Sequence, residues 1–239
     1  MLPIAYSEFA QIFRNRAVLI SNLIMPLAAS AFFIYYRDGF AGIGSLGYVA
    51  AVLVFTVGAF SLYTTAVTTM AARRQDLFLK RLRSTAAGDP AILSGLTLPV
   101  VLTAVVQAVA ILGVFAAVSG RPAQPALLVL AILAIFAMML ALAMATAGLT
   151  GSPEQAQVTT LPVSLVTIAV ASWVGITGTE SLTLIKRVLP GGSATELIVN
   201  TWNGGVPLAD SLPLLGPTLG WVVVATYLAL RLFRWEPRR

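Results

Sequence analysis

Six long apolar segments constrain this chain more than any other feature of its sequence. Each is close to the ~20 residues that an α-helix needs to cross the hydrocarbon core of a bilayer, and none has an acidic or basic side chain near its middle. A charge at that depth costs about 2.5–3.5 kcal/mol, so its absence is typical of segments that contact lipid. We predict transmembrane helices over residues 17–36, 46–71, 91–118, 126–149, 158–178 and 214–233.

Composition excludes a soluble protein of this length. Hydrophobic residues make up 58% of the 239 residues and charged residues 10%, against about 45–50% and about 25% in soluble domains. The sequence has no cysteine and no histidine, which excludes disulfides and metal sites built from thiolates or imidazoles. The predicted fold class is therefore an all-α integral membrane protein with six transmembrane helices, in one transmembrane domain over residues 1–239.

Residues 2–16 have the pattern of an amphipathic helix that lies in the headgroup plane and leads into the first span. Apolar residues recur there at helical spacing, at Leu2, Ala5, Tyr6, Phe9, Ile12 and Phe13. The alternative interpretation is a simple cytoplasmic extension of the first span.

Basic residues predict the orientation, because short cytoplasmic loops are enriched in lysine and arginine. With a cytoplasmic N-terminus, 11 of the 15 basic residues fall inside: Arg14, Arg16, Arg73, Arg74, Lys80, Arg81, Arg83, Arg231, Arg234, Arg238 and Arg239. The other four fall outside: Arg37, Arg121, Lys186 and Arg187. We therefore expect a multi-pass protein of the cell inner or plasma membrane with both termini in the cytoplasm. The net charge of +6 is a topology signal and does not indicate nucleic-acid binding.

The loop over residues 73–89 combines basic and apolar residues in an unusual way. Its members of interest are Arg73, Arg74, Leu77, Phe78, Lys80, Arg81, Leu82 and Arg83. Topology-setting charge explains the arginines, and anionic headgroups could also attract them. Charge alone does not explain apolar side chains outside the membrane, which favour a protein contact.

Hydroxyl residues form stripes at helical spacing in two of the predicted spans. They are Ser61, Thr64, Thr65 and Thr68 in the second span, and Thr160, Ser164 and Thr167 in the fifth. They could line a translocation pathway, which Phe55, Phe60 and Trp173 could narrow. The alternative is that they satisfy carbonyls of their own or a neighbouring helix, which is the commoner use of such groups. The isolated Asn22 and Gln107 are expected to bond to neighbouring helices.

Residues 179–213 are too polar and too rich in proline and glycine to span, and we predict an extracellular segment there. Two short helices fit, at about 181–189 and 194–202. Ser193 and Glu196 have the spacing of a capping box at the start of the second. Glu196 could instead serve the exit of a pathway, and Lys186 and Arg187 could pair with it or lie among headgroups.

The stretch from Leu79 to Thr85, followed by Gly95, resembles the loop between spans two and three of type-2 ABC transporter permeases, most closely the drug-exporting branch. The order of elements is also similar: an amphipathic lead-in helix, six spans and a long segment between spans five and six. Family members often have a proline after the Ser/Thr pair, whereas this chain has Ala86 and Ala87 there and Pro90 later. The local backbone is therefore expected to differ.

The resemblance implies a type-2 ABC exporter fold in which the loop at 73–89 is a coupling helix that docks on an ATP-binding subunit. It also implies short re-entrant helices between spans five and six, and an extracellular gate that includes Pro190 and Glu196. The expected partners are two copies of the ATP-binding subunit, a second permease protomer, identical or paralogous, membrane lipids and a small-molecule cargo. ATP and Mg²⁺ are expected on the partner subunit, with no cofactor bound by this chain.

The sequence has no G-x-x-x-x-G-K-[ST] motif and no set of residues typical of a catalytic site. The leading hypothesis is therefore the membrane subunit of an ATP-driven exporter, not itself an enzyme, that moves a small hydrophobic or amphipathic compound such as a drug or antibiotic by alternating access. Alternatives are an ATP-independent channel or secondary carrier, or an exporter of a lipid-linked or polysaccharide cargo. A membrane-embedded enzyme is disfavoured because no catalytic residues are recognisable.

Overall fold

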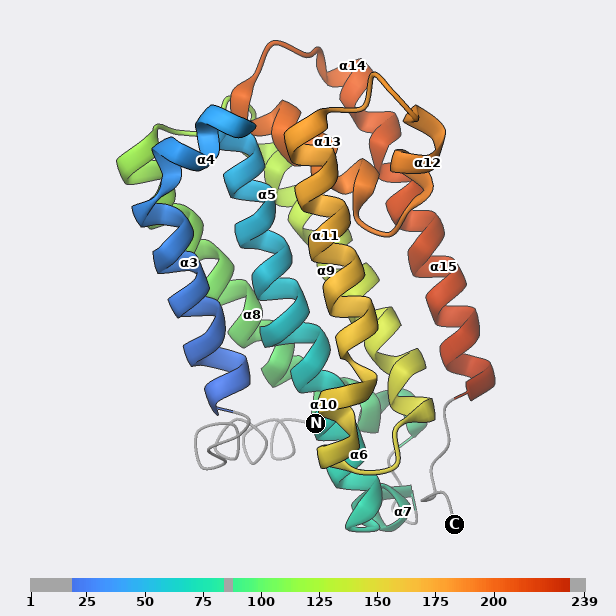
Figure 1. Cartoon of the computed structure of the whole chain (residues 1–239). Helices are drawn as coiled ribbons and strands as arrows, with labels where there is room; N and C mark the ends of the chain where they lie inside the picture. Colours follow the sequence, from blue (N-terminus) through green and yellow to red (C-terminus); the bar gives the residue numbers. More distant parts are fainter. Residues whose placement is uncertain (1–18, 84–87, 233–239) are drawn as a thin grey trace.

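The computed structural model describes residues 19–83 and 88–232. Within these ranges the chain forms helices joined by short turns, with no strand. Long helices run up and down the bundle, and short helices lie at both of its ends (Figure 1). We refer to the end that carries α7 (Phe78–Arg83) as the α7 end, and to the end that carries α13 (Gly192–Asn203) as the α13 end. The prediction of an all-helical fold is thus confirmed.

Five helical stretches in the described ranges are long and apolar enough to cross a membrane: Leu46–Gln75, Ala91–Ser119, Pro125–Leu149, Pro153–Thr177 and Leu208–Leu232. They correspond to five of the six predicted spans. The apolar helix at the first predicted span, Asn22–Tyr35, is shorter. The predicted start of that span and the lead-in helix at residues 2–16 lie outside the described residues, so a sixth span stays a prediction.

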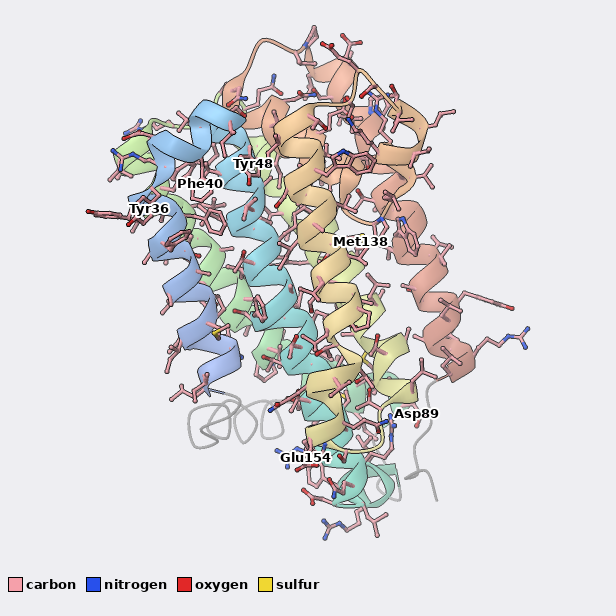
Figure 2. The ribbon with its side chains drawn as sticks, viewed as in Figure 1. Tyr36, Phe40, Tyr48, Asp89, Met138 and Glu154 are labelled. Atoms are coloured by element: carbon pink, nitrogen blue, oxygen red, sulfur yellow. The ribbon has the colours of Figure 1, made fainter. Side chains whose placement is uncertain are left out.

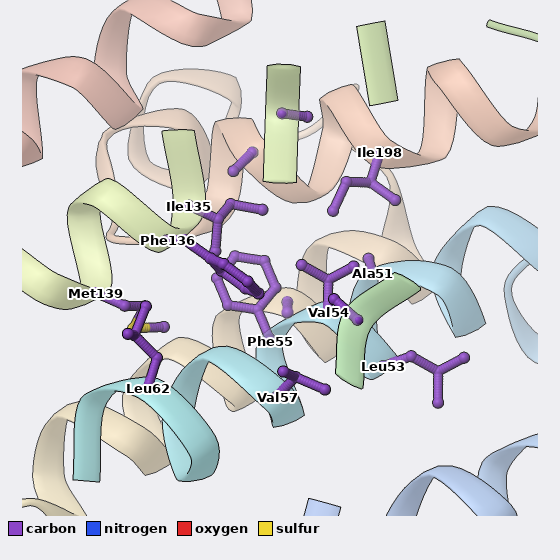
Figure 3. Packing of buried hydrophobic residues seen from close by; sticks show 14 of the residues in the cluster. Ala51, Leu53, Val54, Phe55, Val57, Leu62, Ile135, Phe136, Met139 and Ile198 are labelled. Atoms are coloured by element: carbon purple, nitrogen blue, oxygen red, sulfur yellow. The ribbon is translucent and has the colours of Figure 1, made fainter. Parts of the chain in front are cut away.

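The second of the predicted spans forms the centre of the bundle. It consists of α5 (Leu46–Thr56), the π-helix η2 (Val57–Thr64) and α6 (Thr65–Gln75). Ser45 begins it, because its hydroxyl accepts a hydrogen bond from the Tyr48 amide at 3.1 Å. In its most apolar stretch 89% of the residues are buried, since the other long helices surround it (Figure 1). Phe55 and its neighbours pack there against Phe136 and Met139 (Figure 3).

The first described helices pack against this centre from one side. The π-helix η1 (Ile20–Ile24) continues into α3 (Met25–Tyr35), and α4 (Arg37–Ile43) turns over the α13 end. After α7, the chain returns through α8 (Asp89–Ser119) and then α9 (Pro125–Leu149).

The fifth predicted span begins earlier than its apolar run. It divides into α10 (Pro153–Thr159) and α11 (Leu161–Thr177). The Ser152 hydroxyl caps α10 by accepting from the Gln155 amide at 3.2 Å. Proline lacks an amide hydrogen, and Pro162 lies in the first turn of α11, which fits the break at Thr160.

Four short helical pieces and the last long helix complete the fold. They are α12 (Thr183–Val188), α13, α14 (Leu208–Ser211), η3 (Leu212–Leu214) and α15 (Leu215–Leu232). Thus α12 and α13 lie where two short helices were predicted. Gly47 brings α5 and α13 together: a β-carbon on it would lie 2.7 Å from the Val199 Cα. Such small residues permit close helix contacts in membranes.

The predicted capping box at Ser193 and Glu196 is wrong. Gly191, at φ 97°, precedes the first residue of α13, so the helix begins earlier than the motif requires. The left-handed conformation at this position favours glycine. The Ser193 hydroxyl instead bonds to the Thr218 hydroxyl of α15 at 3.1 Å, and Glu196 binds Arg187.

Candidate functional site

The predicted coupling loop contains an exposed turn and the short helix α7. Leu77 connects α6 to α7 at φ 56°, a conformation that costs a bulky side chain energy. Its side chain is nevertheless 47% exposed. The turn and α7 lie at the same end of the bundle as α10 (Figure 1). An apolar residue is therefore presented at a protruding corner.

The other apolar residues of this loop divide between the interior and the surface. Leu79 is fully buried in a small cluster with Met70, Ile92 and Leu96. Phe78 is half-buried at the edge of that cluster, with the Arg73 guanidinium 5.1 Å from its ring centroid. Packing against α6 and α8 thus explains part of the apolar pattern and leaves Leu77 outside.

Three predicted members of the loop, Lys80, Leu82 and Arg83, belong to α7, but their side chains lie outside the described set. Arg81 is exposed, and its Nη2 donates to the Asp76 carbonyl at 3.2 Å. This bond ties the start of α7 to the turn before it.

Arg74 does not lie on the surface of the loop. Its side chain is 0% exposed, and its Nη1 donates to the carbonyls of Ala147 at 2.8 Å and Thr150 at 3.2 Å. These carbonyls end α9, where a helix has acceptors without helical partners and a partial negative charge. Arg74 therefore fixes α6 to the C-terminal end of α9.

The same corner is joined to α10 by hydroxyl groups. Thr150 Oγ1 lies 2.9 Å from Thr159 Oγ1, in the last turn of α10. Arg74 and Thr150 together form a continuous set of polar contacts from α6 through the end of α9 to α10.

The hydroxyl stripe of the second span bonds mainly within its own helix. Thr64 donates to the Ala59 carbonyl at 2.9 Å, and Thr65 donates to the Phe60 carbonyl at 3.1 Å. Both acceptors lie five residues back, as the wider π-helical turn allows. Thr68 donates to the Thr64 carbonyl at 2.8 Å. This arrangement favours the alternative in which these groups satisfy backbone carbonyls.

Ser61 belongs to a buried polar cluster with Asn22 and Gln107. Its hydroxyl donates to the Asn22 carbonyl at 2.7 Å and contacts Gln107 Oε1. Gln107 Nε2 donates to the same Asn22 carbonyl at 2.8 Å. The cluster joins the two π-helices to α8. Gln107 thus bonds to a neighbouring helix, as predicted. Asn22 takes part only through its backbone carbonyl. Both polar atoms of the Asn22 side chain are buried without a hydrogen-bond partner.

Replacing Gln107 by Leu is expected to lower the free energy of unfolding by about 1 kcal/mol, because polar contacts between membrane helices average about 0.6 kcal/mol and reach about 1.7. Thermal unfolding in detergent would measure the change. Thr103→Val is the matched control, because the Thr103 hydroxyl bonds within α8 to the Pro99 carbonyl at 2.8 Å. Equal effects of the two substitutions would contradict a role of the cluster in joining helices.

The hydroxyl stripe of the fifth span faces the protein interior. Thr160 donates to the Ala156 carbonyl and Thr167 to the Val163 carbonyl, at 2.7 and 2.8 Å. Ser164 is buried, and its hydroxyl has no hydrogen-bond partner. The opposite face of α11 is exposed and apolar, at Leu161, Leu165 and Val166. In this conformation the hydroxyls are therefore inside the protomer and the apolar face is outside.

The three aromatic residues predicted to narrow a pathway have different surroundings. Phe55 is fully buried and lies so close to Gly191 that a β-carbon there would be 2.9 Å from its ring. Phe60 is half-buried. Trp173 is 37% exposed, and the Lys186 ammonium lies 5.2 Å from its ring centroid.

The predicted gate residues lie among short helices at the α13 end. Glu196 and Arg187 form a two-bond ion pair, with Arg187 Nε to Oε2 at 2.8 Å and Nη2 to Oε1 at 2.7 Å. These hydrogen bonds raise the pKa of the Arg187 guanidinium above its usual value. Pro190 is half-buried in the turn between α12 and α13. Glu196 thus ties these two helices together.

Lys186 was predicted to pair with Glu196 or lie among headgroups, but the structure places it inside. It is 1% exposed, and its ammonium donates to Thr177 Oγ1 at 2.9 Å, to the Gly178 carbonyl at 2.7 Å and to Ser181 Oγ at 3.4 Å. It therefore closes the loop after α11.

Within the described ranges, no group of three or more acidic residues could hold a metal ion. Comparison with protein-family models gave no match, and comparison with curated proteins also gave none. The five apolar helices of membrane length indicate a membrane protein.

Proposed function

We propose that this chain is the membrane subunit of an ATP-driven exporter, similar to type-2 ABC permeases, with ATP hydrolysed on a separate polypeptide. Two permease protomers would enclose the pathway, and the two ATPase subunits would dock at the α7 end. The cargo would be a small hydrophobic or amphipathic compound, since the exposed face of α11 is apolar at Leu161, Leu165 and Val166.

The observation that carries this proposal is the exposed turn at Leu77. Its side chain is apolar and 47% exposed, and its backbone is in a conformation that costs a bulky residue energy. Neither property benefits an isolated protomer. A partner surface that buries the side chain would offset both costs, and the exposed Arg81 nearby favours an acidic rim on that partner.

The polar contacts of Arg74 supply a route by which such docking could move the bundle. A partner that displaces α7 also displaces α6, because only the turn at 76–77 separates them. Arg74 passes the displacement to the end of α9, and the Thr150–Thr159 contact passes it to α10. α11 follows α10 after one residue, so the helix with the exposed apolar face would move with it.

A channel or carrier without a motor is the competing function. Carriers of this kind commonly have intramembrane charges or broken helices in both halves of the chain. Among the side chains that the structure describes, the buried cations Arg74 and Lys186 bind carbonyl or hydroxyl groups near the ends of spans. Such contacts support a structural role for both cations.

The test is co-purification of the chain with an ATPase encoded beside its gene. Leu77→Asp is expected to lower the amount of co-eluting ATPase by at least about tenfold, because a central apolar contact becomes a buried charge. Aspartate tolerates the left-handed conformation better than leucine, so the variant should insert and fold normally.

Leu182→Asp is the matched control. Leu182 is also at φ 56° and is 58% exposed, but it lies beside α12 at the opposite end of the bundle. ATPase recovery should remain unchanged in this variant. Equal recovery with both variants, or no ATPase with the unmodified chain, would refute the proposal.

A further inference from the structure

A groove of about 480 Å³ lies between α3 and α8, which run side by side in Figure 1. Its volume is within the ~300–1,000 Å³ range of ligand sites. The two helices supply apolar walls at Leu27, Ala31, Ile34, Ala110, Ile111 and Val114. Leu27 is 42% and Val114 is 55% exposed. In a membrane this groove therefore opens toward the surrounding lipid.

Arg37, the first residue of α4, lines the groove at its α4 end. Tyr36, which precedes it in the chain, is labelled in Figure 2. Its Nη1 donates to the Ile34 carbonyl at 3.3 Å, so the guanidinium turns back along α3. Its Nε lies 3.6 Å from Asp38 Oδ1, a side chain that is 86% exposed. A guanidinium has five N–H donors, so these contacts leave donors for a phosphate.

Ser30 adds a second polar group deeper in the groove. It lines the groove and is 2% exposed, and its hydroxyl has no hydrogen-bond partner. An unpaired hydroxyl away from water costs free energy that an acceptor would recover. Ser30 lies four residues before Ile34, or about 6 Å along the helix axis, below the level at which the Arg37 guanidinium is held.

A second groove on α8 has apolar walls but no cation. It has a volume of about 280 Å³ and is lined by Gly113, Leu133 and Trp202 among others, none of them charged. The α3–α8 groove differs because its apolar lining also includes the unpaired hydroxyl of Ser30 and, nearer the membrane surface, the guanidinium of Arg37.

We propose that the α3–α8 groove binds one membrane phospholipid. An acyl chain lies along the apolar floor, an ester carbonyl accepts from the Ser30 hydroxyl, and the phosphodiester accepts from the Arg37 guanidinium. The spacing of the two polar groups along α3 matches a headgroup phosphate above the ester of the same lipid. This site is independent of the coupling surface and of any motor.

Native mass spectrometry of the full chain in detergent, with added phosphatidylglycerol, tests the proposal. The unmodified protein is expected to retain one phospholipid per chain. Arg37→Gln should weaken retention about tenfold, since it removes a charge-assisted hydrogen bond. Ala110→Trp, which fills the groove, should abolish retention, and Ser30→Ala should weaken it without changing the fold.

Two controls separate this site from general lipid binding. Arg121→Gln removes an exposed arginine outside the groove, and Gly113→Trp places the same bulk in the second groove of α8, where nothing lies within 4 Å of the new β-carbon. Both should retain the lipid. Retention that is the same in all variants, or that falls equally in the controls, overturns the proposal. The proposal is also overturned if the protein is a dimer, and Ala110→Trp dissociates that dimer without changing lipid retention. A second copy of the chain would then occupy the groove.

Discussion

Replacing Gly192 by Ala is expected to destabilise the protein by about 3 kcal/mol or more, at the upper end of the cost of overpacking. A β-carbon at this position would lie 1.7 Å from the Lys186 carbonyl oxygen and 2.8 Å from its carbonyl carbon. The obstacle is backbone, so no side-chain rotation relieves it. Retreat of α12 is also opposed, because the Lys186 ammonium is held by Thr177, Gly178 and Ser181.

Thermal unfolding in detergent, followed by intrinsic tryptophan fluorescence, measures this effect. The expected decrease in Tm is about 6 °C or more, at about 2–4 °C per kcal/mol for a chain of this size. Gly113→Ala is the matched control, because nothing lies within 4 Å of its new β-carbon. It should raise stability by up to about 1 kcal/mol through helix propensity. If the Gly192→Ala protein unfolds at the same temperature as the unmodified chain, α12 and α13 do not pack this closely.

Replacing Arg74 by Met is also expected to destabilise the protein strongly. Methionine keeps most of the length of the side chain but removes the guanidinium that donates to the Ala147 and Thr150 carbonyls. Hydrogen bonds to charged groups contribute about 1.5–3 kcal/mol each. Removal of the buried charge offsets part of this contribution, so we expect the free energy of unfolding to fall by about 2–4 kcal/mol.

Arg73→Met tests whether the effect belongs to this contact. Arg73 is the adjacent arginine and is half-buried beside Phe78, an interaction of about 0.5–1 kcal/mol at partly exposed sites. The unfolding temperature of Arg74→Lys should lie between those of Arg73→Met and Arg74→Met, because lysine keeps the charge but not the planar pair of donors. If all three variants unfold at the same temperature, Arg74 does not hold the end of α9.

The apolar runs predicted where the long helices lie, because length and hydrophobicity depend on local sequence alone. The second span was expected to begin at Leu46, where α5 begins. The last stretch of helix begins at Leu208 instead of 214, because α14 and η3 continue the helical path through polar residues that a hydropathy pattern rejects.

Which side of each helix faces protein could not be predicted from the same pattern. In lipid both the buried and the exposed sides of a helix are apolar, so periodicity does not separate them. The hydroxyls of Thr160 and Thr167 could therefore be placed on one face, but not inside or outside the protomer. The partners of Arg74 and Lys186 could not be predicted either. Arg74 donates to two carbonyls distant in sequence, and Lys186 donates to a carbonyl and two hydroxyls around a loop; carbonyls occur at every residue and give no sequence signal.

The π-helix η2 fixes the rotational phase between the two halves of the central span. An α-helix turns by about 100° per residue, and a π-helix turns by less because its hydrogen bonds reach one residue further. If Val57–Thr64 formed a regular α-helix instead, everything after it would therefore be rotated about the helix axis. The span would still be long enough to cross the bilayer. Arg74, however, would point away from the end of α9, and the turn at Leu77 would face another side of the bundle. The wider turn of this helix therefore sets a direction as well as a depth.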